Sequence, residues 1–461
     1  MSRARGAASF LGGLVWLAIA GVAVAADPAP GPASQAQVMA AAAPAAPTAP
    51  VPAVPFGITG VLQLRNFSHF HDTPRDHRNI RNEAIAEVKW KRSLSPWSEI
   101  RLVGDVRVDD DEFADGVHFQ IPETTKRRSI LNLSEGVLRL HRAPVEVTLG
   151  KQTYAWGTAD AANPTDYLNP YDLLDVLERT KIGIWSAAFT ATGGPLSYSI
   201  VFVPVFTPSR DPLPRSRWAP RIPPGFVGVV DDRELPGKDL DTWQVASRLK
   251  ATVRGWDASI SYYDGYENTP VVRRRQVAVT PFFTVPRLTP VYTRLQAVGL
   301  DFSTTFDKLE VHGEGAFKFV ESRGRDDRFQ WIVGANYPLD ELPVKWLERI
   351  DLILEYSRET LLDTREGSPF ERSRGFFSAA FRNAMAGRVR LKFNEETQFS
   401  LSGTTDFESA PNYYVQFKLT HKLTDAFHVE GGVDVIAGPQ DSFWGQWRDN
   451  DRAFAVMKYF F

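Results

Sequence analysis

The sequence predicts an all-β chain, a transmembrane antiparallel β-barrel of about 18 strands (16–18) with an inward-folded third external loop. Three observations support this prediction. Apolar and polar residues alternate with period two in runs that repeat from residue 57 to 461. The connections between these runs are alternately short and long. No apolar stretch after residue 25 reaches the roughly 20 residues of a membrane helix, so a membrane-spanning chain must close its sheet.

The first residues are typical of a secretory signal, and we assign residues 1–25 to it. Arg3 and Arg5 precede an apolar run, and Ala23-Val24-Ala25 offers a small-residue cleavage site. A single membrane anchor is the alternative, which the shortness of the run disfavours. Residues 26–55 are rich in Ala and Pro and predict a periplasmic linker or, alternatively, a tether to a periplasmic partner or the cell wall. The barrel is then expected over residues 56–461.

Composition excludes several classes of protein. The chain has no cysteine, which rules out disulfides, thiolate metal sites and lipid attachment through cysteine. Its 53 Lys and Arg residues balance 55 Asp and Glu residues, which argues against a nucleic-acid partner.

The strands are expected in chain order, and each has a length suited to crossing an outer membrane at a tilt. They are residues 57–70, 82–92, 97–108, 130–142, 145–152, 181–191, 196–206, 242–253, 256–263, 291–305, 308–320, 327–337, 347–358, 379–393, 396–407, 412–421, 426–437 and 451–461. The long connections are 109–129, 153–180, 207–241, 264–290, 359–378 and 438–450, whereas turns such as Arg254-Gly255 are tight. An even strand number places both termini in the periplasm.

Charged residues recur on one face of the expected strands, opposite an apolar face. Such a density of charge cannot fill a dry core, so this face is expected to line a water-filled lumen. The predicted pore-lining residues are Arg101, Arg107, Arg248, Lys250, Glu310, Glu314, Asp351, Glu355, Arg388, Arg390 and Lys392. The basic members could form a ladder that guides anions, and salt bridges across the lumen are the alternative.

The chain ends in AVMKYFF, with Met457, Tyr459 and Phe461 on one face of the last strand. This ending resembles the membrane-insertion signature of Gram-negative outer-membrane barrels. The resemblance implies localisation in the cell outer membrane, contact with lipid and lipopolysaccharide, and recognition by the barrel-assembly machinery. Two basic runs, Lys126–Arg128 and Arg273–Arg275, could gather anionic solutes or lipopolysaccharide phosphates, or they are simply solvated.

Residues 150–183 interrupt the alternation with two Asn-Pro steps and a short apolar run. Asn169-Pro170 could cap and start a helix over residues 171–178, with Asp172 near its N-terminus. Leu173, Leu174 and Leu177 would pack on an inner wall patch, and Trp156 would anchor the segment near the rim. We therefore predict a constriction loop that contains Trp156, Gly157, Asp160, Asn163, Pro164, Asp166, Asn169, Pro170 and Asp172.

The same stretch resembles a G-[RK]-Q…W-G…D…N-P-x-D pattern of porin-like outer-membrane proteins, including alginate-export-type barrels. Here the pattern runs from Gly150-Lys151-Gln152 through Trp156-Gly157 to Asn169-Pro170. The resemblance implies a porin-like barrel of eighteen strands and does not fix a substrate. The Asp and Asn side chains could instead cap turns, or Asp160, Asp166, Asp172 and Asp175 could bind calcium, although their spacing is not that of an EF-hand.

The functional prediction is an outer-membrane porin for diffusion of small hydrophilic solutes, including anions. The alternative is a barrel that works with a periplasmic partner, either as an exporter of polysaccharide or as the sheath of a porin–cytochrome conduit. We expect no cofactor, no metal, no catalytic residue and no enzymatic activity. His312 beside Glu310 and Glu314, and His428 beside Glu430, are the best local constellations, but no hydrolase motif accompanies them.

Overall fold

The computed structural model describes residues 57–73, 75–220, 228–237, 240–280, 282–321, 327–362, 382–408 and 411–461. The predicted signal and linker lie outside these residues. Within them, no helix has the length and apolar character to cross a membrane.

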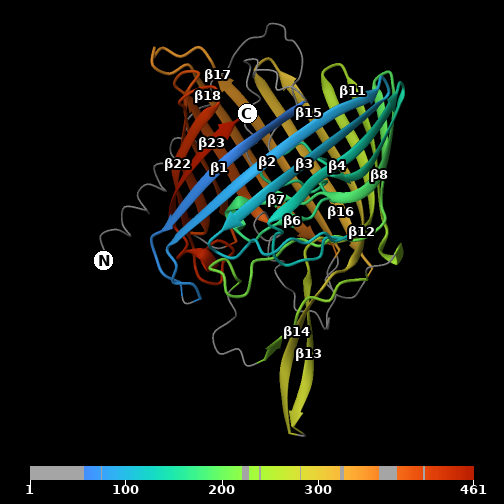
Figure 1. Cartoon of the computed structure of the whole chain (residues 1–461), viewed down its shortest axis with the longest axis vertical. Helices are drawn as coiled ribbons and strands as arrows, with labels where there is room; N and C mark the ends of the chain where they lie inside the picture. Colours follow the sequence, from blue (N-terminus) through green and yellow to red (C-terminus); the bar gives the residue numbers. More distant parts are fainter. Residues whose placement is uncertain are drawn as a thin grey trace. The chain divides into compact units, whose positions relative to one another are not determined.

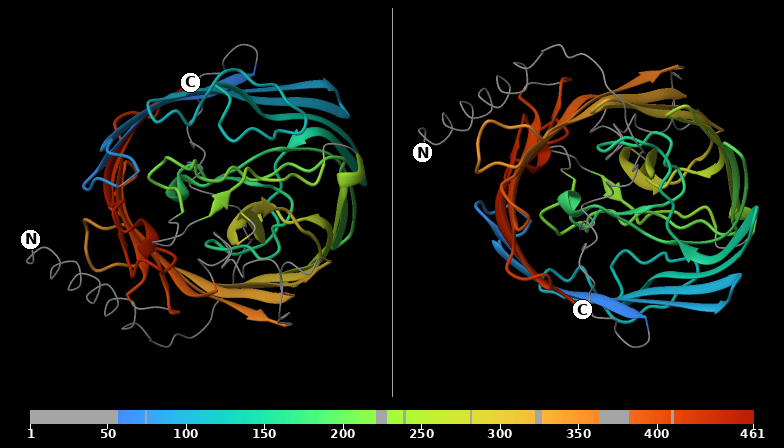
Figure 2. Two further views of the ribbon diagram at one scale, coloured as in Figure 1. Left: turned by 90° about the horizontal axis from the view of Figure 1, so that it is seen from below. Right: turned by 90° about the horizontal axis from the view of Figure 1, so that it is seen from above.

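Eighteen antiparallel strands form one closed sheet (Figures 1 and 2). They are β1 (Ile58–His69), β2 (Ile80–Ser95), β3 (Ser98–Asp109), β4 (Leu131–Arg142), β5 (Val145–Gln152), β8 (Ile184–Gly193), β9 (Leu196–Val203), β11 (Gln244–Val253), β12 (Trp256–Tyr266), β15 (Arg294–Phe306), β16 (Leu309–Val320), β17 (Arg328–Leu339), β18 (Arg349–Leu361), β19 (Asn383–Lys392), β20 (Thr397–Asp406), β21 (Tyr413–Lys422), β22 (Phe427–Ala437) and β23 (Arg452–Phe460). Each strand pairs with its neighbours in chain order.

The last strand pairs with the first and removes both sheet edges. Val61 lies opposite Phe460 and His69 opposite Arg452 along this seam. Beyond the strand, the backbone N–H of Gly60 donates to the carbonyl of Phe461 at 2.8 Å, and Phe461 donates back at 3.1 Å. Closure satisfies the backbone groups that an open edge would leave unpaired. The prediction of a closed eighteen-stranded antiparallel barrel is confirmed.

The two faces of the sheet differ as the alternation predicts. Large apolar side chains on one face are exposed around the barrel, including Leu64 on β1, Leu300 on β15 and Met457 on β23. Leu64 is 60% exposed, although burying such a side chain is favourable by roughly 2 kcal/mol. A continuous apolar outer face is the surface that a lipid bilayer would cover.

Shorter elements lie in the long connections and are absent from the sequence prediction. A hairpin of β13 (Val271–Thr280) and β14 (Phe283–Val291) extends from the end of the barrel that carries the long connections (Figure 1), and β10 (Val229–Val230) pairs with β14. Two 3₁₀ turns, η2 (Leu240–Thr242) and η4 (Gly445–Trp447), occur in other connections.

Buried apolar residues form two clusters inside the barrel. One joins inward-facing residues of β8 to β16, such as Ile184, Val203 and Leu295, to Trp156, Tyr167 and Leu168. The other consists mainly of residues from the long connections, including Phe113, Leu174, Trp218 and Trp447, with Ile436 of β22. The connections are therefore packed against one another and against the wall.

Candidate functional site

The candidate site is the connection between β5 and β8, residues 153–183, which we call loop 3. Seen along the barrel, its green trace is drawn within the ring of strands (Figure 2). It contacts the wall in three places, and each contact uses a different chemistry.

The predicted helix over residues 171–178 is wrong. Tyr171–Asp172 forms a short strand (β6) that pairs with Thr180–Lys181 (β7), and only Val176–Glu178 forms a 3₁₀ turn (η1). Asp175 caps this turn, because its side chain accepts a hydrogen bond from the N–H of Leu177 at 3.0 Å. Local propensity favoured a helix after Asn169-Pro170, but the β6–β7 pairing commits the same backbone groups to a strand.

Asn169 has a different role from the predicted helix cap. Its side-chain oxygen accepts from the N–H of Tyr154 at 2.6 Å, and its amide donates to the carbonyls of Ile182 at 2.8 Å and Gln152 at 3.3 Å. The carbonyl of the next residue, Pro170, accepts from the N–H of Ile182 at 2.8 Å. This completely buried asparagine thus holds the two ends of loop 3 together.

The first contact with the wall is apolar. Trp156, Tyr167 and Leu168 pack on the inward faces of β8 to β16. Trp156 is therefore buried against the wall rather than placed at the rim, and the Arg248 guanidinium lies 5.9 Å from its ring centre. Of the leucines expected on an inner wall patch, Leu174 packs among the long connections together with Ile436 of β22, and Leu177 packs against the same cluster.

The second contact joins the tip of loop 3 to Glu314 of β16. This carboxylate accepts from the N–H groups of Ala159 at 3.0 Å and Thr165 at 3.1 Å, and its remaining partners are the N–H of Thr158, the hydroxyl of Thr165 and the amide of Asn163. Gly157 allows this approach: its φ is +96°, and a Cβ there would lie 2.6 Å from a Glu314 oxygen.

Glu355 of β18 holds the adjacent residues of the tip. Its carboxylate accepts from the N–H of Asp160 at 2.6 Å and of Ala161 at 2.7 Å. It also pairs with Nε2 of His312 at 2.8 Å, although His312 lies two strands away on β16. The two side chains meet over Gly334 of β17, where a Cβ would lie 2.6 Å from each of them. Glu314 and Glu355 therefore form one acceptor surface, which we call the carboxylate dock.

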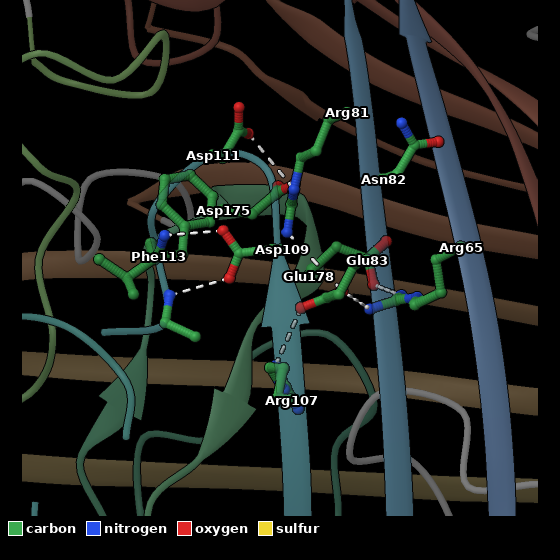
Figure 3. A network of polar contacts seen from close by, with 12 residues as sticks. Arg65, Arg81, Asn82, Glu83, Arg107, Asp109, Asp111, Phe113, Asp175 and Glu178 are labelled. Carbon is green, nitrogen blue, oxygen red and sulfur yellow. Dashed lines mark hydrogen bonds and ion pairs between the residues drawn. The ribbon is translucent and has the colours of Figure 1, made fainter. Parts of the chain in front are cut away.

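The third contact is a network of buried charges on the side of β1, β2, β22 and β23, part of which Figure 3 shows. Arg81 donates to Asp175 at 2.5 Å and Arg452 donates to the same carboxylate at 2.6 Å. Arg452 also donates to Asp434 at 2.7 Å. Burial alone would raise the pKa of Asp175, but the guanidinium groups of Arg452 and Arg81 hold it well below its usual range.

Asp172 belongs to the same side of the loop. It accepts from Nε of Arg128 at 2.8 Å and from Arg210 at 2.9 Å, so it joins three long connections. Arg128 also contacts Glu83 of β2 at 3.2 Å. The interpretation of Lys126–Arg128 as an exposed basic run is therefore wrong for Arg128, whose side chain is buried. Asp166 instead pairs with Lys181 and accepts from the Tyr171 hydroxyl.

The other predicted pore-lining residues point inward and mostly pair locally. Arg248 bonds Asp301 at 2.9 Å, Lys250 bonds Asp257 at 3.1 Å, and Arg107 bonds Glu83 at 3.4 Å. Arg101 pairs with Glu135. On β18 and β19, Arg390 lies 3.6 Å from Asp351, and Lys392 lies 3.1 Å from Glu348. The Glu310 carboxylate accepts a hydrogen bond from the side-chain amide of Asn336 at 3.3 Å.

Burial divides the inner wall into two parts. Over residues 295–301 of β15 the outward residues are exposed, whereas Leu295, Ala297 and the other inward residues are buried beneath loop 3. Along β20, by contrast, every residue except Asp406 is only partly buried, and β21 has no buried residue. A packed interior would bury one face of these strands. Their inward face therefore contacts solvent, and it adjoins Arg388 and Arg390 of β19 through the pairing of β19 with β20.

The residues that the sequence offered for metal binding and for catalysis have other partners in the structure. No group of three or more His, Asp or Glu side chains among the residues that the structure describes could hold a metal ion. The calcium interpretation of the loop is not supported, since Asp172 and Asp175 bind arginines. His312, the best sequence candidate for catalysis, is buried and engaged with Glu355 in the dock.

The fold and the site define a closed eighteen-stranded barrel with an apolar outer face and a charged, partly solvated interior. No protein-family model matches the chain, and no curated protein matches it. Solved barrels resemble it in structure: OccK3 (OpdO) of Pseudomonas aeruginosa has a TM-score of 0.49 at 9% identity, covering 88% of this chain and 95% of that one.

Two further barrels are similar to the same degree. OccK5 (OpdH) of Pseudomonas aeruginosa has a TM-score of 0.48 at 11% identity, covering 87% of this chain and 97% of that one. Wzi, a carbohydrate-binding outer-membrane barrel involved in group 1 capsule assembly in Escherichia coli, has a TM-score of 0.47 at 11% identity, covering 87% and 84%.

Proposed function

We propose that this protein is an outer-membrane channel through which small hydrophilic solutes diffuse. The observation that carries the proposal is the partly solvated inner face of β20 and β21 within a closed barrel whose outer face is apolar. A closed barrel with a wet, polar interior is the architecture of a pore. The short turns face the periplasm in this proposal, and both termini lie there.

Loop 3 is the constriction of the proposed channel. It contacts β16 and β18 through the carboxylate dock, and β2 and β23 through Asp175. It thereby reaches both sides of the lumen and restricts solutes to the space that remains. An interior crossed in this way also leaves little room for a protein occupant, so we favour the channel over the sheath of a porin–cytochrome conduit.

The test is single-channel conductance of the purified full chain in a planar lipid bilayer. We expect discrete, steady conductance steps with the native protein alone. A protein that inserts as a folded barrel and conducts no ions would contradict the proposal. That result would favour the alternative of an exporter or sheath that needs a periplasmic partner.

The basic residues of β19 are proposed to favour anions. Replacing Arg388 and Arg390 with glutamine is expected to shift the reversal potential in a salt gradient toward cations, because fixed lumenal charge sets ion preference. Arg248→Gln is the control, since its side chain points inward but lies beneath Trp156. Equal shifts in the control and the double variant would contradict a role specific to β19.

Asp160 makes the preference depend on pH. Burial and the nearby Glu355 charge raise the pKa of Asp160 to about 6, against the influence of Arg388 and His312, with Glu310 also nearby. Below that pH the carboxyl is neutral, so the tip of loop 3 loses a negative charge. We therefore expect anion selectivity to increase as the pH falls from 7 to 5. Asp160→Asn should show the stronger anion preference already at pH 7, and a native-like pH response in this variant would exclude Asp160 as its source.

A further inference from the structure

We propose that the mouth of the barrel at the short turns holds a binding site for a small, hydroxylated organic anion; the inference deepens the proposed channel function and rests on it. A cavity of about 850 Å³ lies there. Its wall comes from the start of β1, the end of β2, and from β3 and β4. Its inner side comes from Thr153 and Lys181, the two ends of loop 3. This volume falls in the range of ligand-binding pockets, about 300–1,000 Å³.

The charge of the lining favours an anion. Four cationic side chains face two carboxylates, Glu87 and Glu135, and the cations are Lys89, Lys91, Arg101 and Lys181. Lys89 and Lys91 pair with Glu87 and Glu99 at 3.0 Å, but their side chains are 57% and 63% exposed. Ion pairs at such exposure contribute little, so an incoming anion can displace the glutamates at small cost. Lys181 differs, since its side chain is only 14% exposed and is held by Asp166.

The uncharged lining favours hydroxyl groups on that anion. Four hydroxyl side chains border the cavity, and each can donate and accept: Thr59, Ser93, Ser134 and Thr153. The aliphatic stems of Lys89, Lys91 and Arg101 supply apolar surface between the charges, against which the C–H face of a polyol can lie. Gly57, Trp90 and Val103 complete the lining. A sugar acid or sugar phosphate matches this combination of cations, hydroxyls and short apolar surfaces.

The position of the cavity means that a ligand reaches the site from the side of the short turns. It contains the beginning and the end of loop 3, and Glu135 in its wall accepts from both Arg101 and Thr153. A ligand bound here sits against the base of the constriction, on the side of the short turns. A bound anion is therefore expected to interrupt the current more strongly when added from that side.

The experiment is titration calorimetry of the detergent-solubilised full chain with sodium gluconate, glucose 6-phosphate and glucose, followed by bilayer recordings with each probe on either side. The test variant is Lys89→Gln with Lys91→Gln. The control is Lys250→Gln with Lys308→Gln, two part-exposed lysines (41% and 35%) outside the cavity. We expect native protein and control to bind an anionic probe, the test variant to bind it about tenfold more weakly, and glucose to bind more weakly still.

Comparing gluconate with glucose 6-phosphate tells a carboxylate head group from a phosphate. Equal binding in native protein and test variant, or glucose bound as tightly as the anions, overturns the inference. If the protein conducts ions but binds no probe, the channel function stands and the proposed binding site is wrong. If the protein binds an anionic probe but conducts no ions, the binding site stands and the channel function is wrong. The experiment therefore distinguishes failure of the binding site from failure of the channel.

Discussion

Replacing Glu314 and Glu355 with alanine is expected to raise the single-channel conductance, because the double variant releases the tip of loop 3 from the wall. The two carboxylates accept from five backbone N–H groups, those of Thr158, Ala159, Asp160, Ala161 and Thr165, at 2.6 to 3.2 Å. A buried donor left without a partner costs about 1–3 kcal/mol. Several such donors together cannot stay buried against an alanine surface, so the tip must move to reach water.

The matched control is Glu310→Ala on the same strand as Glu314. Glu310 also faces the lumen, but its hydrogen-bond partner is Asn336 of β17 rather than loop 3. The Glu310→Ala variant removes one inward negative charge and leaves the hydrogen bonds of the loop 3 tip in place. Its effect on conductance therefore measures the contribution of charge apart from that of docking. If Glu310→Ala raised conductance as much as the double variant, charge rather than release of the loop would explain the result.

A substitution in loop 3 is expected to disrupt the same carboxylate dock. Gly157→Ala introduces a methyl group where 2.6 Å separates it from a Glu314 oxygen, at a φ of +96° that alanine rarely adopts. The wall carboxylates remain in place in this variant. A conductance increase shared by Gly157→Ala and the double variant would therefore identify the docked tip itself as the constriction.

The sequence predicts the barrel well because the barrel follows from local pattern. Alternation with period two identifies a strand within its own ten residues, and all eighteen expected runs coincide with strands of the sheet. The alternation of short and long connections then orders them around the barrel. The hairpin of β13 and β14 was not predicted, because an arginine run and two prolines, Pro286 and Pro290, obscure its alternation of apolar and polar residues.

The contacts of loop 3 could not be predicted in the same way. Glu314 lies 149 to 156 positions from the groups that it accepts from, and nothing in its own strand marks it as different from Glu310. Residue type alone identified Glu314 and Glu355 as pore-lining, whereas their hydrogen bonds make them positioning residues for the loop. The error at residues 171–178 has the same origin, since pairing of β6 with β7 depends on Asn169 joining distant ends of the loop.

Replacing Arg452 with methionine is expected to destabilise the folded barrel by about 3 kcal/mol, the lower end of the cost of breaking a buried ion pair. Arg452 is fully buried and bonds Asp175 and Asp434. The expected loss of stability lies at the lower end of that range because each carboxylate keeps a partner. Asp175 keeps Arg81, and Asp434 keeps the Tyr414 hydroxyl at 2.9 Å. Urea unfolding of the protein in lipid vesicles, followed by tryptophan fluorescence, measures this difference.

Arg139→Met is the control for the loss of an arginine. Its side chain is 45% exposed and pairs with Glu146, so we expect a loss of about 1 kcal/mol or less. Similar losses in Arg139→Met and Arg452→Met would show that burial of the network does not decide its contribution.

The pH dependence of unfolding separates the ionic contribution of Arg452 from its packing. The pKa of Asp175 lies below its usual value in the folded state, so its charge stabilises the native protein above about pH 4 and this stabilisation is lost on further acidification. In Arg452→Met the pKa of Asp175 rises toward its usual value, and the change in stability below pH 4 becomes smaller. If Arg452→Met lowers stability by the same amount at pH 3 as at pH 7, packing around the lost side chain is responsible and the ion pair is not. If the difference narrows on acidification, the charge of Arg452 is what fixes loop 3 to β23.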